Sequence, residues 1–467
     1  MVHQSIGKHI YDQFVEILGE EFVIVDQEVL GEYAHDETEK LLFFPEVVVR
    51  PRTALEVSRI MQICNKEKIH VTPRGAGTGL SGGALPHLGG LLLSTDRMNS
   101  ILKIDEENLQ VITEPGVITQ VIQDAVKAVG LFYPPDPSSK GSCFIGGNIA
   151  ENSGGPKAVK YGVVKDYVLN LEVVLPTGEI IWTGSNVLKN ATGYNLTQLM
   201  VGSEGTLGIV TKIVLKLIPH PKHDLLMLVP FSSLEKASEA VSAIFKAGFT
   251  PSALELVEID ALKIVSKYMS SSSIPLTDDT AAHLIIEVDG NHIDMLRLEM
   301  ESIAELLLQF DCGEIYFADD AQQKDVLWSM RRKVAEYVKL EGYTIEEDTV
   351  VPRAALPALI KSLKQLGNQL DFKVVCYGHA GDGNLHVRIF KEGIPNSHNH
   401  PEMTAILREL FQVVKSLGGT ISGEHGVGLI QKPYLNIVID ETRMNMMRGI
   451  KKVFDPNGIL NAGKIFD

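Results

Sequence analysis

The chain has 467 residues, with 43 Lys+Arg against 59 Asp+Glu and a formal net charge of −16. This length predicts about two or three domains. A hydrophobic content of 45% and a charged content of 22% exclude a disordered protein. The acidic balance argues against nucleic acid as the main partner, because phosphate groups select a basic face.

The cysteines and the N-terminus bear on location. No apolar run reaches the ~18 residues of a membrane span, and residues 1–5 lack a basic segment followed by an apolar one. Cys64, Cys143, Cys312 and Cys376 include no C-x-x-C pair, which excludes a self-contained iron–sulfur cluster or zinc ribbon with four cysteine ligands. We expect a reduced, cytoplasmic protein without a membrane span.

The first half alternates helical and extended patterns. Helices are predicted at 8–18, 54–66 and 117–129, and strands at 47–51, 69–73, 91–95, 109–113, 168–175, 179–183 and 208–217. Such an alternation predicts an α/β or α+β unit. Pro219 and Pro221 mark a domain boundary.

The second half predicts another α+β domain. Helices are expected at 233–247, 259–269, 292–310, 320–341, 354–370, 402–417 and 440–453, and strands near 253–258, 283–289, 314–318, 373–377 and 385–390. The serine run at 270–273 predicts an exposed loop.

Residues 77–82 match the G-x-G-x-x-G pattern of a Rossmann loop, but residues 83–90 do not fit its context. A Rossmann loop requires a helix to start inside the motif. Residues 83–90 hold further glycines and Pro86, which leave no room for such a helix before the strand at 91. We therefore reject an NAD fingerprint. A tight turn without a ligand and an anion-binding loop both remain open.

Three more glycine clusters lie in the same half, at 145–148, 152–156 and 202–208. Glycine lets a ligand approach the backbone closely. Several such loops predict a long ligand in an extended groove.

Four segments in this order resemble the FAD domain of the vanillyl-alcohol-oxidase/PCMH flavoprotein superfamily. They are Pro73–Leu80, Tyr133–Pro137, Gly146–Asn148 and Gly202–Gly208. The resemblance extends over nearly the whole chain. It is closest to the branch that contains the glycolate oxidase FAD subunit, D-lactate dehydrogenases and D-2-hydroxyglutarate dehydrogenase.

The resemblance implies an α+β fold in three parts. A two-part PCMH-type FAD-binding domain is expected at 1–220 and an α+β substrate (cap) domain at 221–420. A C-terminal segment, 421–467, is expected to return to the flavin and complete its site.

The resemblance also implies two sets of cofactor-binding residues. The loop that binds the pyrophosphate comprises Pro73, Arg74, Gly75, Ala76, Gly77, Thr78, Gly79 and Leu80. The other FAD contacts are Pro135, Asp136, Gly146, Gly147, Asn148, Asn152, Ser153, Gly155, Glu204, Gly208, Ile209 and Asn461. Some relatives tether FAD through a His in the loop. Thr78 stands at that position here, so we expect non-covalent FAD.

Titratable groups gather in two segments of the second half, 377–386 and 422–428. His379 and His386 flank a turn that can bring both imidazoles onto one centre, and two imidazoles with a carboxylate are a common ligand set for a divalent metal. The alternative for any single His is a core or surface residue without a ligand, as we predict for His398 and His400.

Both segments match motifs of the resembled family. The match implies that His379, His386 and Glu424 bind a metal and that His425 is the general base. Mixed nitrogen and oxygen ligands suit zinc, manganese or iron.

The implied reaction is oxidation of an (R)-2-hydroxy acid to the 2-oxo acid. A metal on the substrate oxygens lowers the pKa of the hydroxyl group, a neutral imidazole accepts its proton, and hydride leaves for flavin N5. Arg331, in Trp328–Arg332, matches the arginine that binds the substrate carboxylate in the family. The alternative is a solvated helix face for Arg331 or Arg332.

Two positions bear on the substrate. Ala335 and Glu346 stand where D-2-hydroxyglutarate dehydrogenases carry a Thr and a Lys for the distal carboxylate, and a glutamate would repel that group. Arg388 shares a strand face with His386 and either binds a distal acid or neutralises Glu346. D-lactate or glycolate is therefore favoured, with D-2-hydroxyglutarate as the alternative.

The expected partner is a separate electron acceptor, because the chain has no NAD loop and no cluster cysteines. An electron-transfer flavoprotein, a quinone-linked protein or an iron–sulfur protein would serve, and a homodimer is left open. One rival interpretation is an oxidase or C–C bond synthase of the same superfamily. Another is a flavin-binding subunit of a multi-subunit glycolate oxidase complex.

Overall fold

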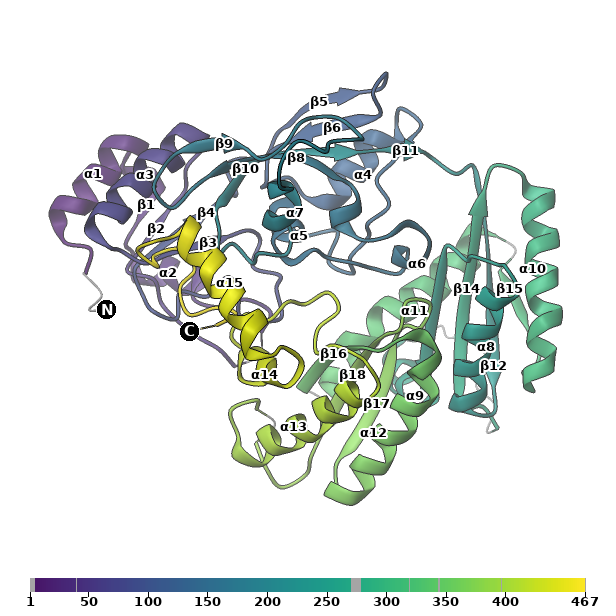
Figure 1. The fold of residues 1–467 in the computed structure, drawn as a ribbon. Coiled ribbons are helices and arrows are strands. Elements are labelled where there is room, and N and C mark those ends of the chain that lie inside the picture. The colour runs from purple at the N-terminus through teal and green to yellow at the C-terminus, as the bar shows by residue number, and fades with distance from the viewer. Residues whose placement is uncertain are drawn as a thin grey trace. The chain divides into compact units, whose positions relative to one another are not determined.

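The computed structural model describes residues 5–38, 40–269, 279–318, 320–342, 345–395 and 397–466. The chain forms two compact units (Figure 1). Unit 1 comprises Met1–Ser153, Val163–His220 and Glu424–Asp467, and unit 2 comprises Gly154–Gly162 and Pro221–Gly423. The serine-rich loop predicted at 270–273 lies outside the described residues.

Unit 1 contains two sheets and a short ribbon. The first sheet has the order β1-β2-β4-β3, antiparallel between β1 and β2 and otherwise parallel; its strands are β1 (Val23–Ile24), β2 (Val47–Val49), β3 (Val71–Arg74) and β4 (Leu91–Ser94). The second sheet is antiparallel with the order β5-β6-β10-β8-β9. It comprises β5 (Ile101–Asp105), β6 (Gln110–Thr113), β8 (Val168–Val174), β9 (Ile180–Trp182) and β10 (Ile209–Lys216). The ribbon pairs β7 (Leu131–Phe132) with β11 (Ile218–Pro219).

The helices of unit 1 are α1 (Lys8–Leu18), α2 (Gln27–Tyr33), α3 (Ala54–Glu67), α4 (Thr119–Lys127), α5 (Ile145–Glu151), α7 (Leu196–Met200), α14 (Leu435–Val438) and α15 (Glu441–Phe454). Short 3-10 turns occur at Glu20–Phe22, Val164–Asp166 and Lys432–Tyr434.

Helix α3 illustrates how sequence sets local structure. Thr53 and Glu56 form a capping box that satisfies backbone N–H groups of the first turn. Ile60, Met61 and Cys64, on one face of the helix, enter the hydrophobic core of the four-stranded sheet.

Helix α5 differs from the loop expected at the 145–148 glycine cluster. A Cβ atom on Gly146 would lie 2.6 Å from the Pro115 side chain, so this glycine allows the helix to approach the turn at Pro115 closely. Residues 75–90, by contrast, form no helix, and the rejection of a Rossmann loop is confirmed.

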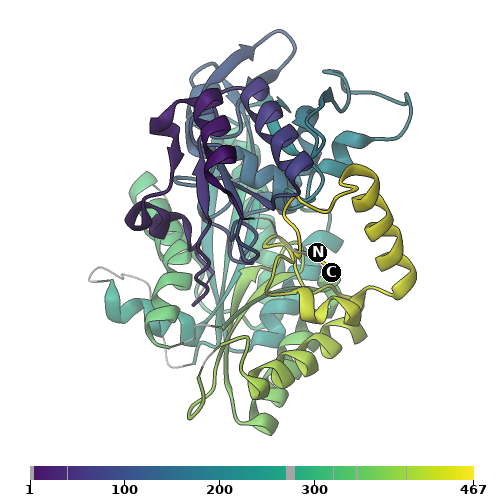
Figure 2. The ribbon, with the colours of Figure 1, turned by 90° about the vertical axis from the view of Figure 1, so that its left-hand side faces the viewer.

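The C-terminal stretch, yellow in Figures 1 and 2, belongs to unit 1. Beyond α15 it pairs with β3. The Val71 N–H donates to the Ile459 carbonyl and the Asn461 N–H donates to the Val71 carbonyl, both at 2.8 Å. The segment thus joins the first sheet of unit 1, and its expected return to the flavin stays a prediction.

Unit 2 contains a seven-stranded antiparallel sheet with the order β15-β12-β14-β13-β17-β18-β16. Its strands are β12 (His223–Phe231), β13 (Ala253–Glu258), β14 (Ala282–Gly290), β15 (Tyr316–Ala318), β16 (Ile345–Val350), β17 (Lys373–His379) and β18 (Asn384–Phe390). Its helices are α6 (Ala158–Tyr161), α8 (Leu234–Lys246), α9 (Ile259–Tyr268), α10 (Ile293–Leu307), α11 (Ala321–Leu340), α12 (Leu356–Leu370) and α13 (Pro401–Ser416), with 3-10 turns at Leu308–Phe310 and Arg353–Ala355.

Helices α9 and α11 pack on one face of this sheet. Their apolar side chains share a hydrophobic core with Val257 of β13, Ile285 of β14 and Val375 of β17. The α+β class is confirmed. Among the described residues, no helix is both long and apolar enough to cross a bilayer. The roles expected for 1–220, 221–420 and 421–467 remain predictions.

Candidate functional site

A row of polar side chains crosses the face of the unit 2 sheet on which α9 and α11 pack. Directly opposed residues of an antiparallel pair share a face, and the register pairs Tyr377 with His386, Val375 with Arg388, and Arg388 with Glu346. His379, two residues beyond Tyr377 on β17, shares that face. Strands β13, β17, β18 and β16 thus contribute Glu255, Tyr377, His379, His386, Arg388 and Glu346, which we call the polar row.

The two histidines of the polar row come from the β17–β18 hairpin, as the flanked turn in the sequence predicts. Both are buried. Their ring centroids are 5.4 Å apart with an interplanar angle of 79°. One ring nitrogen of each lies within 4.8 Å of the other, so the pair can offer two nitrogen ligands to one ion.

Glu255 lies at the centre of the buried charges, and sequence reasoning missed it. Its Oε1 accepts a hydrogen bond from His379 Nδ1 at 2.7 Å, and its Oε2 accepts one from Arg331 Nε at 2.7 Å. Burial raises the pKa of Glu255, but the charges of His379 and Arg331 outweigh burial and lower the pKa to about 2. The carboxylate is therefore ionised near neutral pH.

Arg331 is a buried side chain of α11, whereas Arg332 beside it is exposed. The solvated helix face that stood as the alternative for these arginines thus describes Arg332 and not Arg331. The Arg331 guanidinium also stacks over the Tyr377 ring, 5.3 Å from its centroid.

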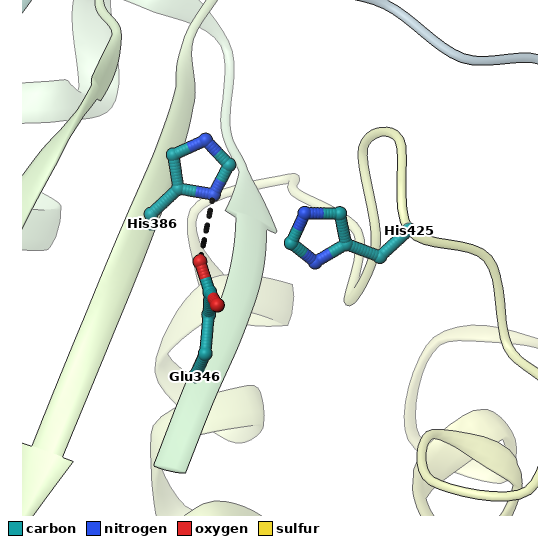
Figure 3. Close-up of side chains that lie close together, drawn as sticks. All are labelled: Glu346, His386 and His425. Carbon is teal, nitrogen blue, oxygen red and sulfur yellow. Dashed lines mark ion pairs between the residues drawn. The ribbon is translucent and has the colours of Figure 1, made fainter. Parts of the chain in front are cut away.

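Arg388 forms an ion pair with Glu346 and donates from Nε to the Tyr377 hydroxyl at 3.1 Å. Of the two roles left open for Arg388, the structure thus has it neutralising Glu346. The same carboxylate lies 3.6 Å from His386 Nδ1 (Figure 3). Burial raises the pKa of Tyr377 to about 12, so its hydroxyl is protonated.

Asp348 is a second residue that sequence reasoning missed. It lies opposite His386 on β16 and accepts from the Gly423 N–H at 2.8 Å and the Ser422 hydroxyl at 3.1 Å. A Cβ atom on Gly423 would lie 2.6 Å from Asn384 Nδ2, so a larger residue would have to displace this side chain. Figure 3 shows His425 on the loop that comes next in the chain. Three consecutive acids inside a strand pattern were the available signal for Asp348, since such residues are depleted from strands.

In unit 1, the segment after His425 is held by Glu204. The Val427 and Gly428 N–H groups donate to its carboxylate at 2.8 and 2.6 Å. The backbone oxygen of Glu204 accepts from Asn461 Nδ2 at 2.8 Å. The Glu204 carboxylate, expected at the cofactor, thus anchors the C-terminal segment.

The predicted pyrophosphate loop follows β3. A Cβ atom on Gly77 would lie 2.3 Å from the Arg74 guanidinium, whereas one on Gly79 would have nothing within 4 Å. Arg74 Nη1 and Ser81 Oγ are buried and make no hydrogen bond among the described residues. Buried polar atoms usually have a partner, so these two fit a loop that binds a polar ligand such as the FAD pyrophosphate.

The other expected cofactor residues differ in surroundings. A Cβ atom on Gly147 would have nothing within 4 Å, whereas one on Gly208 would lie 2.4 Å from Val173 Cγ1. Asn148 is buried and bonded to the Thr119 hydroxyl, and Asn152 ends α5 with a φ of 56°. The remaining positions are placed as follows: Gly75, Ala76, Thr78 and Leu80 lie in the loop after β3; Pro73 is in β3; Pro135 and Asp136 follow β7; Ser153 follows α5; Ile209 begins β10; and Gly155 belongs to unit 2.

Comparison with known proteins identifies the class. A family model for an FAD binding domain matches residues 45–184, and one for the C-terminal domain of FAD linked oxidases matches residues 220–465. The fold is similar to that of p-cresol methylhydroxylase with substrate bound, with a TM-score of 0.80 at 18% identity, covering 98% of this chain and 96% of the other.

Curated relatives are similar over nearly their full length. Glycolate oxidase subunit GlcD of Bacillus subtilis (strain 168) is 39% identical, covering 99% of this chain and 97% of the relative. D-lactate dehydrogenase of Anaerostipes hadrus is 37% identical, covering 99% and 98%. The chain belongs to the FAD-linked oxidase family of PCMH type and is an FAD-linked oxidoreductase homologous to 2-hydroxy-acid dehydrogenases and oxidases.

Proposed function

We propose that the protein oxidises a small (R)-2-hydroxy acid, D-lactate or glycolate, to the corresponding 2-oxo acid. One observation carries the proposal. A buried guanidinium, that of Arg331, and two buried imidazoles, those of His379 and His386, lie on one sheet face of unit 2. Arg331 can bind a carboxylate, and the two imidazoles beside it can bind a metal ion. This arrangement suits a substrate whose hydroxyl and carboxylate groups are on adjacent carbons.

The proposed reaction assigns each group a role. FAD and a divalent metal, when bound, supply the hydride acceptor and the Lewis acid that lowers the pKa of the substrate hydroxyl group. Arg331 binds the substrate carboxylate and fixes its orientation. His425 accepts the hydroxyl proton as hydride leaves the α-carbon.

His379, His386 and Glu424 form the proposed metal ligand set. The nitrogens of the two histidines fit a zinc, manganese or iron ion. Gly423 is fixed by Asp348, which lies opposite His386. Glu424 is the next residue after Gly423. The hydrogen bond from Gly423 to Asp348 therefore restricts where Glu424 can lie, which supports its role as the third ligand.

The charge balance in the polar row supports a monocarboxylate. Arg388 is paired with Glu346, so its charge is balanced within the protein. A second substrate carboxylate at this position would be repelled by Glu346, which would weaken substrate binding. D-2-hydroxyglutarate is the second candidate, because Arg388 lies in the polar row. If Glu346 did not neutralise it, its guanidinium could bind the distal carboxylate of this substrate.

Anaerobic reduction of the bound flavin tests the proposed function. The protein is mixed with 2-hydroxy acids of both chiralities and the flavin absorbance is followed. D-lactate or glycolate is expected to bleach the flavin and L-lactate is not. Flavin that every 2-hydroxy acid leaves oxidised would refute the proposal.

The same assay tests the substrate preference through Glu346→Gln. We expect the ratio of kcat/KM for D-2-hydroxyglutarate to that for D-lactate to rise at least about tenfold, the equivalent of about 1.4 kcal/mol. Glu402, half exposed and paired with Lys391, gives the control Glu402→Gln, for which the ratio should not change. An unchanged ratio in Glu346→Gln would remove Glu346 as the determinant.

Electrons from the reduced flavin are proposed to pass to a separate acceptor, either an electron-transfer flavoprotein, a quinone-linked protein or an iron–sulfur protein. The likeness to a protein named as a glycolate oxidase subunit supports the second interpretation, a flavin-bearing subunit that works within a complex. Full activity of such a complex with His425→Ala would favour a silent subunit over a catalytic one.

A further inference from the structure

Glu255 holds two side chains with different proposed tasks. Its carboxylate is fully buried on β13. One oxygen accepts from His379 and the other from Arg331, each at 2.7 Å. A buried carboxylate is costly unless both oxygens are satisfied, and here each oxygen is satisfied by a different partner.

The contact to His379 fixes the state of that ring. An ionised carboxylate only accepts hydrogen bonds, so the His379 proton resides on Nδ1. In the neutral ring, which is the form that binds a metal, the lone pair is then on Nε2, at the opposite side of the ring. A carboxylate behind a ligating histidine fixes its orientation and increases its basicity.

The contact to Arg331 fixes the guanidinium plane. Nε donates to Glu255, and Nη2 lies 2.7 Å from the same oxygen. The Nε–Nη2 edge of the guanidinium therefore faces Glu255. The remaining N–H groups, on Nη1 and the outer side of Nη2, are the ones that can meet a carboxylate.

We propose that Glu255 is a positioning residue that aligns a metal-ligand nitrogen of His379 and the carboxylate-binding edge of Arg331 with each other. The inference rests on the proposed function, in which His379 binds a metal and Arg331 binds the substrate. A 2-hydroxy acid carries its hydroxyl and carboxylate at a fixed separation, so the two protein groups must keep a fixed separation too. One carboxylate that holds both provides it.

Glu255→Gln is the informative change. An amide has one accepting oxygen and one donating nitrogen. If the oxygen stays with Arg331, the NH2 group faces His379 and favours the tautomer with hydrogen on Nε2, which cannot bind a metal. The affinity of the FAD-loaded protein for Zn²⁺ is expected to fall about 10–100-fold.

Glu258→Gln is the matched control. Glu258 is a buried glutamate on the same strand, and it pairs with Lys364 and the Cys376 N–H. It lies three residues from Glu255 and therefore on the opposite sheet face. Its amide variant loses a buried ion pair as well, but we expect its Zn²⁺ affinity and FAD content to equal those of wild type.

The experiment measures Zn²⁺ affinity by chelator competition, FAD content by absorbance and thermal unfolding of both variants. With Zn²⁺ saturating, Glu255→Gln should also raise KM for the substrate, because a neutral amide oxygen holds the Arg331 guanidinium less tightly than a carboxylate does. Equal Zn²⁺ affinity in Glu255→Gln and Glu258→Gln would overturn the inference. If Glu255→Gln does not fold, Glu255→Asp replaces it and should bind Zn²⁺ more weakly than wild type; wild-type affinity would overturn the inference.

The wild type separates this failure from failure of the proposed function. A wild type that binds no divalent metal or oxidises no 2-hydroxy acid refutes the function itself. A wild type that does both, with unaffected Glu255 variants, refutes only the role of Glu255.

Discussion

Two groups of charged side chains in unit 2 are matched in charge. Glu255 meets Arg331 and His379, and Arg388 meets Glu346. Breaking one partner of such a set leaves a charge without compensation in a low-dielectric interior, which costs about 3–5 kcal/mol. Polar groups this expensive are expected at functional positions rather than in a core made for stability alone.

The free energy of unfolding should depend on pH in the acid range partly because of Glu255. Its pKa in the folded chain is about 2, below the ordinary 4.5, so the unfolded chain binds this proton first as the pH falls. Wild type should therefore lose stability relative to Glu255→Gln between pH 4.5 and 2, by up to about 1.4 kcal/mol per pH unit. Urea unfolding in a buffer with chelator, from pH 6 to pH 2, measures the difference.

Glu258→Gln should show the opposite sign in this series. Burial raises the pKa of Glu258 although Lys364 opposes the shift. The folded chain then binds that proton first, and wild type gains stability relative to Glu258→Gln as the pH falls through the raised pKa. The same sign for both variants would contradict the assignment of these two carboxylates.

The histidine hairpin was accessible from sequence at the residue scale, and Glu255 was not. His379 and His386 lie in one continuous segment, where a turn brings them together. Glu255 belongs to a strand some 120 residues earlier in the chain. Its strand carries Glu255 and Glu258 on opposite faces among apolar residues, so no one-sided polar pattern marks either glutamate, and every residue of the strand is buried.

At the element scale, α11 determines which arginine reaches the site. Leu327, Met330, Val334 and Val338 form its buried stripe, and Arg331 lies in that stripe at helical spacing. Arg332, one residue on, is turned by about 100° and meets solvent. The sequence predicted the helix at 320–341 and the importance of Arg331, but its burial depends on the sheet beneath.

Arg331→Lys keeps the charge of this position and removes the planar fork. We expect kcat/KM for D-lactate to fall about 10–100-fold, since loss of one hydrogen bond between charged groups costs about 1.5–3 kcal/mol. Steady-state kinetics with a dye acceptor measure it. Arg332→Lys is the matched control and should retain wild-type kinetics; a loss of equal size in both would show that the substrate arginine is misassigned.

The turn at Gly423 is the element that leads into the proposed Glu424 ligand. Gly423→Ala places a Cβ atom 2.6 Å from Asn384 Nδ2 and 2.6 Å from Val350 Cγ2. We expect a stability loss of about 1–3 kcal/mol together with reduced Zn²⁺ affinity, measured by urea unfolding and chelator competition.

Gly449→Ala provides the contrast, since Gly449 lies within α15 and a Cβ atom there meets nothing within 4 Å. It should gain about 0.5–1 kcal/mol, because alanine costs less conformational entropy in a helix. A stability loss at Gly449 that matches that at Gly423 would remove the steric argument.

At the scale of the whole chain, sequence predicted the elements better than their arrangement. Helices at 8–18, 54–66 and 320–341 and the strand at 253–258 match the structure closely, because each has a local periodic signal. The strand order of the unit 2 sheet depends on pairings such as β13 with β17, which join segments more than a hundred residues apart and leave no local trace. The family resemblance implied an FAD-binding domain and an α+β cap domain, but not this strand order.

The chain passes between the two units more than once. Residues 154–162 of the N-terminal half belong to unit 2, where Lys157 pairs with Glu287 and Lys160 with Asp289. The chain changes units again between Gly423 and Glu424. The predicted boundary near Pro219 and Pro221 is thus one of several points at which the chain passes from one unit to the other. A truncated variant of unit 2 must therefore include residues 154–162 as well as residues 221–423.

The central claim is that a metal-assisted flavoenzyme oxidises a small 2-hydroxy acid. The most direct measurement is anaerobic reduction of the FAD-loaded protein by D-lactate and by glycolate before metal stripping, after stripping with chelator, and after adding Zn²⁺ or Mn²⁺ back. We predict that at least one of the two acids bleaches the flavin in the untreated protein, fails to do so after stripping while FAD remains bound, and bleaches it again when metal returns. Flavin that is bleached equally fast with and without metal, or that neither acid bleaches, would contradict the account.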